Sequence, residues 1–255
     1  MANVSLNNVG VRFRKHAHRS GALKEAVLRR LRPPQWTKGA AVDSNSFWGL
    51  RGVNIQLKDG DRLGIIGRNG AGKSTLLKVI SRIYRPTEGA VGVQGRIVPL
   101  IEIGAGFNPE LSGRENAFLN GAILGIPRKI IAEKLESIID FSELKDFIDM
   151  PVKYYSTGMH LKLAFTLATE SPPDILILDE LYAGGDASFI EKANRRLEKF
   201  VSESRILIIV AHNLEYIRRF ANRAMILSHG TVVEEGTPQS MIDRYLADSK
   251  AGKLV

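Results

Sequence analysis

The chain has 255 residues, of which 44% are hydrophobic and 25% are charged, an ordinary composition for a globular protein. It contains no cysteine, which excludes disulfides and thiolate metal sites. No apolar run approaches the ~20 residues needed to span a bilayer, and the N-terminus lacks the apolar core of a signal peptide. We therefore expect the chain to stay in the cytoplasm and to act at a membrane only through a partner that crosses it.

Positive charge is concentrated near the N-terminus. The formal net charge is +9, from 36 basic and 27 acidic residues. Residues 1–38 contain nine basic residues and one acid, Glu25, so they carry +8 of this charge. Such a segment suggests an anionic neighbour, either nucleic acid, anionic lipid or a pyrophosphate-bearing substrate; a solvated basic surface is the simpler alternative.

The N-terminal part of the chain predicts a strand followed by a basic helix. Residues 3–13 alternate between apolar and polar side chains, as a half-buried strand does. Residues 22–33 predict a short basic amphipathic helix inserted before the next strand. Its apolar stripe and the prolines that stop it are Leu23, Val27, Leu31, Pro33 and Pro34.

The rest of the chain alternates between strand and helix patterns. Residues 47–67 predict two strands joined by the Asp59–Gly60 turn, and residues 74–84 predict a helix. Strands that alternate with helices give a parallel α/β sheet. Further along we expect a strand from 97, a mostly helical block at 112–170, buried strands at 174–180 and 205–212, and a hairpin at 224–236.

Residues 67–74, GRNGAGKS, match the pattern G-x-x-x-x-G-K-[ST] in full. They follow an apolar strand and open a helix, which is the context of a phosphate-binding P-loop. Backbone N–H groups and the helix N-terminus would surround the phosphates, Lys73 would reach the β- and γ-phosphates, and Ser74 would ligate Mg²⁺. The predicted nucleotide-binding residues are Gly67, Arg68, Asn69, Gly70, Ala71, Gly72, Lys73, Ser74 and Thr75.

A second nucleotide motif is ILILDE at 175–180, an apolar strand that ends in two acids. Asp179 is the natural acid on the metal side, and Glu180 can polarise the attacking water. A strand that ends in solvated acids is the simpler alternative, but it is weak beside an intact P-loop. Together the two motifs predict a P-loop NTPase that uses ATP and Mg²⁺.

A third motif, YSTGM at 155–159, resembles the signature LSGGQ of the nucleotide-binding subunits of ATP-binding cassette (ABC) proteins. In that family the signature caps the γ-phosphate of an ATP held by the opposite subunit. Ser156 and Gly158 keep the serine and the second glycine, whereas Thr157 and Met159 depart from the pattern. The hydroxyl and N–H donors at a helix start still allow an anion to be capped.

Other residues follow the order of the family. The resemblance implies that Asp186 lies in the D-loop at the dimer seam, although AGGD departs from the usual SALD, and that His212 senses the γ-phosphate. Glu102 stands where the Q-loop glutamine is expected and would contact the metal or its water. Phe13 and Trp48 are candidates for stacking on adenine, and either could instead belong to the core.

The stretches 104–125, 155–165 and 179–189 narrow the resemblance to ATP-binding subunits of bacterial polysaccharide exporters, which serve O-antigen, capsule and teichoic acid export. This implies a single ABC nucleotide-binding domain over residues 1–255, with a RecA-like core, an N-terminal antiparallel β subdomain and a helical subdomain near 110–170. Some members carry a C-terminal carbohydrate-binding domain, for which the 43 residues after His212 would leave no room.

The resemblance also implies a homodimeric ATPase at the cytoplasmic face of the inner membrane. It would work with two copies of a polytopic permease and export a lipid-linked polysaccharide, most simply of the O-antigen type. Capsule or teichoic acid is an alternative substrate. An ABC ATPase that acts on nucleic acid fits less well, because such proteins usually carry two cassettes or a coiled-coil insertion. A cassette that binds ATP without hydrolysis conflicts with the intact Lys73, Asp179, Glu180 and His212.

Overall fold

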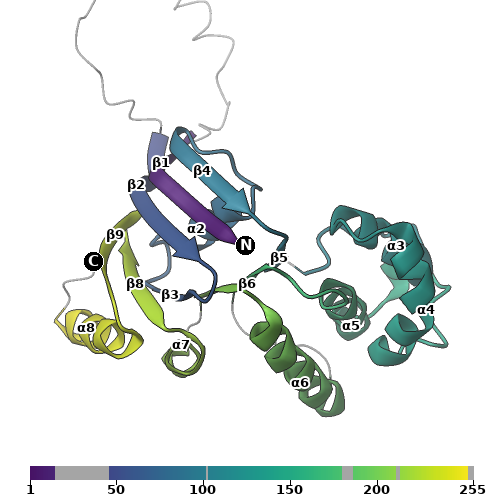
Figure 1. Ribbon diagram of the computed structural model, residues 1–255. Helices are drawn as coiled ribbons and strands as arrows, with labels where there is room; N and C mark the ends of the chain where they lie inside the picture. The colour runs from purple at the N-terminus through teal and green to yellow at the C-terminus, as the bar shows by residue number, and fades with distance from the viewer. Residues whose placement is uncertain (15–45, 102, 180–185, 211–212, 252–255) are drawn as a thin grey trace, which may run out of the picture.

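The computed structural model of the protein describes residues 1–14, 46–101, 103–179, 186–210 and 213–251. Within these residues the strands form a three-stranded antiparallel sheet and a six-stranded mixed sheet, flanked by helices (Figure 1). This arrangement confirms the predicted α/β fold. The basic helix predicted at 22–33 lies outside the described residues.

The antiparallel sheet has β1 (Asn3–Arg14) at its centre, between β2 (Ser46–Lys58) and β4 (Glu88–Gln94). Its inward side chains, among them Val4 and Leu6, are fully buried, because strand residues alternate between the two faces of the sheet. Irregularities in the ladder near Val9 and Val11 shift the register of β1 against β2. At the far end of this ladder Phe13 pairs with Phe47 and Arg14 with Ser46.

The mixed sheet follows the order β5-β6-β7-β3-β8-β9, with only β8 and β9 antiparallel among its described strands. The middle strands β6 and β7 are buried along almost their whole length, as strands covered on both faces are. The bounds are β5 Ile97–Leu100, β6 Ile175–Asp179, β7 Ile206–Val210, β3 Arg62–Ile66, β8 Arg223–Ser228 and β9 Thr231–Gly236.

Helices cover both faces of the mixed sheet (Figure 1). One core lies between the two sheets and includes α2 (Lys73–Ile80), and a second core joins the opposite face to α6 (Ala187–Glu203), α7 (Leu214–Phe220) and α8 (Pro238–Lys250). Among the described residues no helix is both long and apolar enough to cross a membrane.

A separate helical lobe comprises α3 (Gly113–Ile123), α4 (Arg128–Ser142) and α5 (Thr157–Ala168), with a 3₁₀ turn at Val152–Tyr154. α5 belongs to two cores at once. Leu163 and Leu167 pack within the lobe, whereas Phe165 and Ala168 pack under the mixed sheet. The helix that begins at the YSTGM motif therefore connects the lobe to the sheet.

The two strands predicted within 47–67 and the turn between them are confirmed, and the structure adds that they lie in different sheets, because β3 pairs with β7 and β8 rather than with β2. One boundary prediction was wrong. The helix predicted over 74–84 ends at Ile80, and Arg82 then adopts a left-handed conformation with φ of 61°. The helices α6, α7 and α8 were not predicted from the sequence.

Candidate functional site

The P-loop connects the end of β3 to the start of α2. Two of its glycines are required by close neighbours. A Cβ on Gly67 would lie 2.4 Å from the carbonyl oxygen of Leu227, and one on Gly72 would lie 2.6 Å from that of Gly49. Gly72 also caps α2 with φ of 104°, a conformation that side chains strongly disfavour. Backbone on both sides thus fixes the loop in its conformation.

The Lys73 ammonium lies against the same loop. Its Nζ donates hydrogen bonds to the carbonyl oxygens of Gly67 at 2.7 Å and Arg68 at 2.9 Å. Arg68, Asn69 and Gly70 are exposed, so the crest of the loop is open to solvent. The ammonium therefore stands beside exposed backbone N–H groups at a helix N-terminus, the arrangement that favours phosphate.

The loop opens onto a cavity of about 690 Å³, a volume typical of ligand-binding sites. The cavity brings together the P-loop and the end of β6, since Asp179 shares its lining with Lys73 and Ser74. A hydroxyl and a carboxylate are oxygen ligands of the kind that Mg²⁺ prefers, so these donors fit that ion. The remaining lining residues are Phe13, Phe47, Trp48, Gly49, Asn69, Gly70, Gly72, Thr75 and Val210.

Aromatic side chains form one side of this cavity. Phe13 packs against Phe47 and Tyr84, with ring centroids 5.4 Å and 5.7 Å away, and its ring fills the space where a Cβ on Gly49 would stand. Phe47 is 50% exposed at the cavity, whereas Trp48 is half-buried. The sequence suggested Phe13 and Trp48 as residues that stack on adenine, but not Phe47. The signal for Phe47 is its position opposite Phe13 in the β1–β2 ladder, which places it at the same cavity.

The signature residues lie at the start of α5. Ser156 is the N-cap residue, and its Oγ accepts a hydrogen bond from the Met159 N–H at 3.2 Å. Because the hydroxyl is the acceptor in this bond, its own hydrogen stays available for an anion. Ser156 and Thr157 are exposed and Gly158 is half-buried. Although YSTGM departs from LSGGQ at Thr157 and Met159, α5 still begins at a regular side-chain cap.

Ser156 and Gly158 line a second cavity of about 580 Å³, which also includes Asp186. In the part of the chain that the structure describes, the linings of the two cavities have no residue in common. The predicted signature and the P-loop of one chain are therefore not brought into one site. They could act on one nucleotide only if a second copy supplied one of them.

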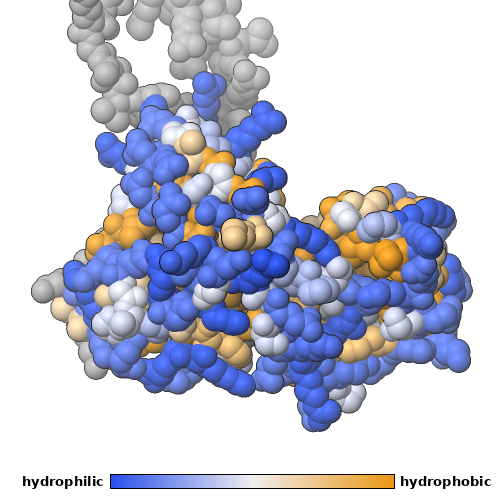
Figure 2. Space-filling view, in the orientation of Figure 1, coloured by the Kyte–Doolittle hydropathy of each residue, from blue (hydrophilic) through white to orange (hydrophobic). Residues whose placement is uncertain are grey.

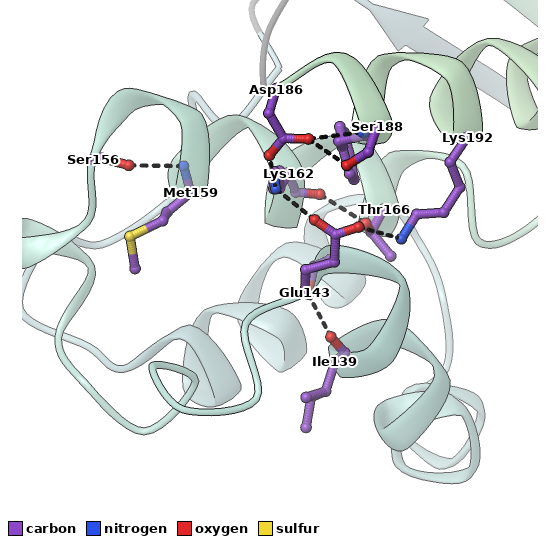
Figure 3. A network of polar contacts seen from close by, with 11 residues as sticks. Ile139, Glu143, Ser156, Met159, Lys162, Thr166, Asp186, Ser188 and Lys192 are labelled. Atoms are coloured by element: carbon purple, nitrogen blue, oxygen red, sulfur yellow. Dashed lines mark hydrogen bonds and ion pairs between the residues drawn. The ribbon is translucent and has the colours of Figure 1, made fainter.

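Asp186 begins α6 as its N-cap residue. One oxygen accepts from the Phe189 N–H at 2.9 Å and from the Ser188 hydroxyl at 2.6 Å, and the other accepts from Lys162 Nζ at 2.6 Å (Figure 3). The Lys162 hydrogen bond, followed by those from Ser188 and Phe189, holds the pKa of Asp186 well below its usual value. Asp186 is thus an ionised cap bound to the signature helix.

Three predicted residues, Glu102, Glu180 and His212, lie outside the described residues. Two of them come soon after described strands in the sequence: Glu180 follows Asp179, the last residue of β6, and His212 comes two residues after Val210, the last residue of β7. Within the described part of the chain no group of three or more His, Cys, Asp or Glu side chains gathers as a metal site. The roles of these three residues remain predictions from the sequence.

The fold and the cavity define a P-loop nucleotide-binding protein. A family model described as ABC transporter matches residues 50–183. The chain belongs to the ABC transporter family.

Several of the curated relatives that it matches are named for the export of O-antigen or teichoic acids. It is 41% identical to the O-antigen export system ATP-binding protein RfbB of Myxococcus xanthus, over 96% of this chain and 56% of that protein. It is 35% identical to RfbB of Klebsiella pneumoniae, over 95% of this chain and 96% of that protein. The teichoic acids export ATP-binding protein TagH of Lactococcus lactis is 40% identical, over 80% of this chain and 45% of that protein. The chain thus spans about half of two of these relatives and nearly all of the third.

Solved structures agree on the fold. A dimeric ATP-binding cassette bound to ADP and Pi is similar with a TM-score of 0.65 at 21% identity, over 92% of this chain and 98% of that one. The ATP-binding subunit of an ABC transporter is similar with a TM-score of 0.66 at 21% identity, over 96% of this chain and 93% of that one. At this identity the likeness establishes the architecture alone.

Proposed function

We propose that this chain is the ATP-hydrolysing subunit of a transporter that exports a lipid-linked polysaccharide of the O-antigen type across the inner membrane. The observation that carries the ATPase assignment is the cavity in which the P-loop, Lys73 and Ser74 meet Asp179. The substrate class rests on the relatives named for O-antigen export. Relatives named for teichoic acid export make another polysaccharide the second candidate.

Each residue of the site has a distinct task in this proposal. The N–H groups of residues 67–75 and the Lys73 ammonium bind the phosphates and stabilise the charge that develops during transfer. Ser74 and Asp179 hold Mg²⁺, which when bound neutralises phosphate charge. Glu180 accepts a proton from the attacking water and His212 contacts the γ-phosphate, while Phe47 or its aromatic neighbours stack on adenine.

The active unit in this proposal is a homodimer in which each ATP lies between two copies. The P-loop cavity of one chain would face Ser156 and Gly158 of the other, with Asp186 at the seam. Support comes from the separation of the two cavities within one chain and from the free hydroxyl hydrogen of the Ser156 cap. ATP would join the copies and hydrolysis would release them.

The helical lobe would transmit this cycle to a polytopic permease, present in two copies. Apolar side chains gather on the surface over α3 (Figure 2), where Ile123 is 61% exposed. Exposed apolar surface of this kind is typical of a protein contact. Residues 1–255 would then be one nucleotide-binding domain, with a helical subdomain near 110–170, bound peripherally at the cytoplasmic face of the inner membrane.

The test is to tag the chain in its native cells, solubilise the membranes gently and identify what co-purifies. We expect one polytopic membrane protein in equal amount, together with ATPase activity in the purified complex. Glu180→Gln should lower turnover by orders of magnitude and trap ATP-bound dimers. Recovery with nucleic acid and without a membrane protein would contradict the export assignment, and full turnover of Glu180→Gln would contradict the role of Glu180.

A further inference from the structure

Four charged residues from three helices form one connected network (Figure 3). Lys162 on α5 lies 2.5 Å from Glu143 Oε2 and 2.6 Å from Asp186 Oδ2, measured from Nζ. Glu143 follows the last residue of α4, and its Oε1 lies 3.0 Å from Nζ of Lys192 on α6. Two carboxylates thus balance two ammonium groups where α4, α5 and α6 meet.

Lys162 is the most enclosed member of this network. Its side chain is 13% exposed, against 38% for Glu143 and 56% for Asp186. The ammonium also lies 5.2 Å from the ring centroid of Phe189, in the cation–π range. Carboxylates on two sides and an aromatic ring therefore fix the position of this ammonium, unlike that of a typical surface lysine.

The network connects two motifs that serve different nucleotides in the proposed dimer. Lys162 stands on the same helix as Ser156, which faces the ATP of the partner. Asp186 is the N-cap residue of α6, the next described element after β6 ends at Asp179 in the nucleotide cavity. An ion pair between Lys162 and Asp186 makes the placement of one motif depend on the other.

We propose that Lys162 is a positioning residue for ATP hydrolysis, which holds Asp186 at the start of α6 against the signature helix α5 so that the two motifs keep a fixed placement. The inference rests on the proposed homodimeric ATPase. Lys162 lines the same cavity as Ser156 and Asp186, and in this proposal it acts through Asp186 and Glu143 rather than on the nucleotide. Its removal should slow turnover without weakening the P-loop cavity, whose lining it does not share.

A second ion-pair cluster supplies the control. Glu170, just beyond α5, forms ion pairs with Lys134 on α4 at 2.9 Å and with Arg196 on α6 at 2.6 Å. It joins α4 and α6 to the far end of α5, but it contains none of the nucleotide motifs. Lys134→Met therefore removes a lysine between helices of the same group and leaves the signature untouched.

The experiment compares ATP hydrolysis and thermal unfolding of the full chain as wild type, Lys162→Met, Lys162→Arg and Lys134→Met. We expect Lys162→Met to lower kcat at least tenfold with an unchanged KM for ATP, Lys162→Arg to recover at least half of the activity, and Lys134→Met to retain kcat. Equal kcat for Lys162→Met and Lys134→Met would overturn the inference. Wild-type hydrolysis is measured first, and its absence would count against the proposed ATPase itself.

Two further variants separate positioning from folding. Asp186→Asn keeps a capping residue but loses the charge, so in combination with Lys162→Met it should slow turnover no further than Lys162→Met alone. Multiplying losses would show that Lys162 does not act through Asp186. If Lys162→Met does not fold, Glu143→Gln takes its place, because it loosens Lys162 and leaves the pair with Asp186; unchanged kcat in that variant would overturn the inference.

Discussion

Gly104 lies directly against the ring of His160. A Cβ built on Gly104 would come within 2.5 Å of His160 Nε2 and 3.2 Å of the Ala164 Cβ, and the glycine has φ of 85°. The His160 ring also packs on Phe107, with ring centroids 4.7 Å apart. The turn that follows β5 and position 102 is therefore in contact with the signature helix through one histidine.

We expect Gly104→Ala to destabilise the protein by about 1–3 kcal/mol. The new methyl group must displace the packed His160 ring, and the alanine must adopt a left-handed backbone conformation. Urea unfolding measures the loss. Gly125→Ala is the matched control, since Gly125 has φ of 71° but nothing within 4 Å of its would-be Cβ. A loss for Gly104→Ala no larger than that of the control would show that the contact with His160 is unimportant.

The exposed Phe47 and the packed Phe13 should respond differently to truncation. Phe47→Ala is expected to weaken ATP binding roughly 5- to 100-fold, the cost of losing one stacked base, with little change in stability. Phe13→Ala should instead lower stability by up to ~3 kcal/mol, the lower end for a core Phe→Ala change, because Phe13 is only half-buried. Calorimetric titration with ATP and urea unfolding distinguish the two. If Phe47→Ala bound ATP with unaltered affinity, Phe47 would not be the adenine contact, and Trp48 and Phe13 would be the remaining candidates.

Glu170 should matter for stability rather than for turnover. Its side chain is 8% exposed and bonded to two cations, so Glu170→Gln leaves Lys134 and Arg196 without their counter-charge. We expect a loss of roughly 1.5–3 kcal/mol in the free energy of unfolding, the range for hydrogen bonds to charged groups. ATP turnover per folded molecule should stay at the wild-type level. A variant of full stability would contradict this reading of the cluster.

The Lys162 network predicts a pH-dependent stability. Hydrogen bonds from Lys162, and for Glu143 also from Lys192, lower the pKa of Asp186 and of Glu143 below their usual 3.8 and 4.5. Carboxylates whose pKa falls on folding stabilise the protein above their unfolded pKa and lose that effect as the pH drops through the folded pKa. The difference in Tm between wild type and Lys162→Met should therefore be full at pH 7 and shrink below about pH 4. A difference independent of pH would mean that the ion pairs contribute nothing.

The fold class and the P-loop were predictable because their signals are local. Residues 67–74 contain both the glycines and the lysine that the loop needs, β6 is apolar up to its last residue Asp179, and β7 is apolar throughout. The helix starts at Asp186 and Thr237 also have local signals, a capping side chain in each case and Pro238 directly after the second. Neither of these two helix starts was predicted from the sequence.

What the sequence could not supply depends on distant partners. Whether β3 pairs with β2 is decided by the bonds that β3 forms with two strands far along the chain, β7 and β8, where Arg62 pairs with Leu207 and Leu63 with Arg223. Phe47 could be recognised only once its register against Phe13 was known, and residues 15–45 separate the two strands. The Lys162 network likewise joins residues from 143 to 192, which no spacing rule brings together.

The pairing of Arg14 with Ser46 has a consequence for how this fold tolerates change. Arg14 and Ser46, the residues that flank the segment 15–45, pair with each other in the β1–β2 ladder. The strand pairing therefore holds the two ends of this segment close together. The entropy of closing such a loop grows slowly, by about 0.6 kcal/mol for each doubling of its length. We therefore expect this segment to be exchangeable between family members, or replaceable by a short linker or a reporter tag, without a shift in the register of the strands beside the nucleotide cavity.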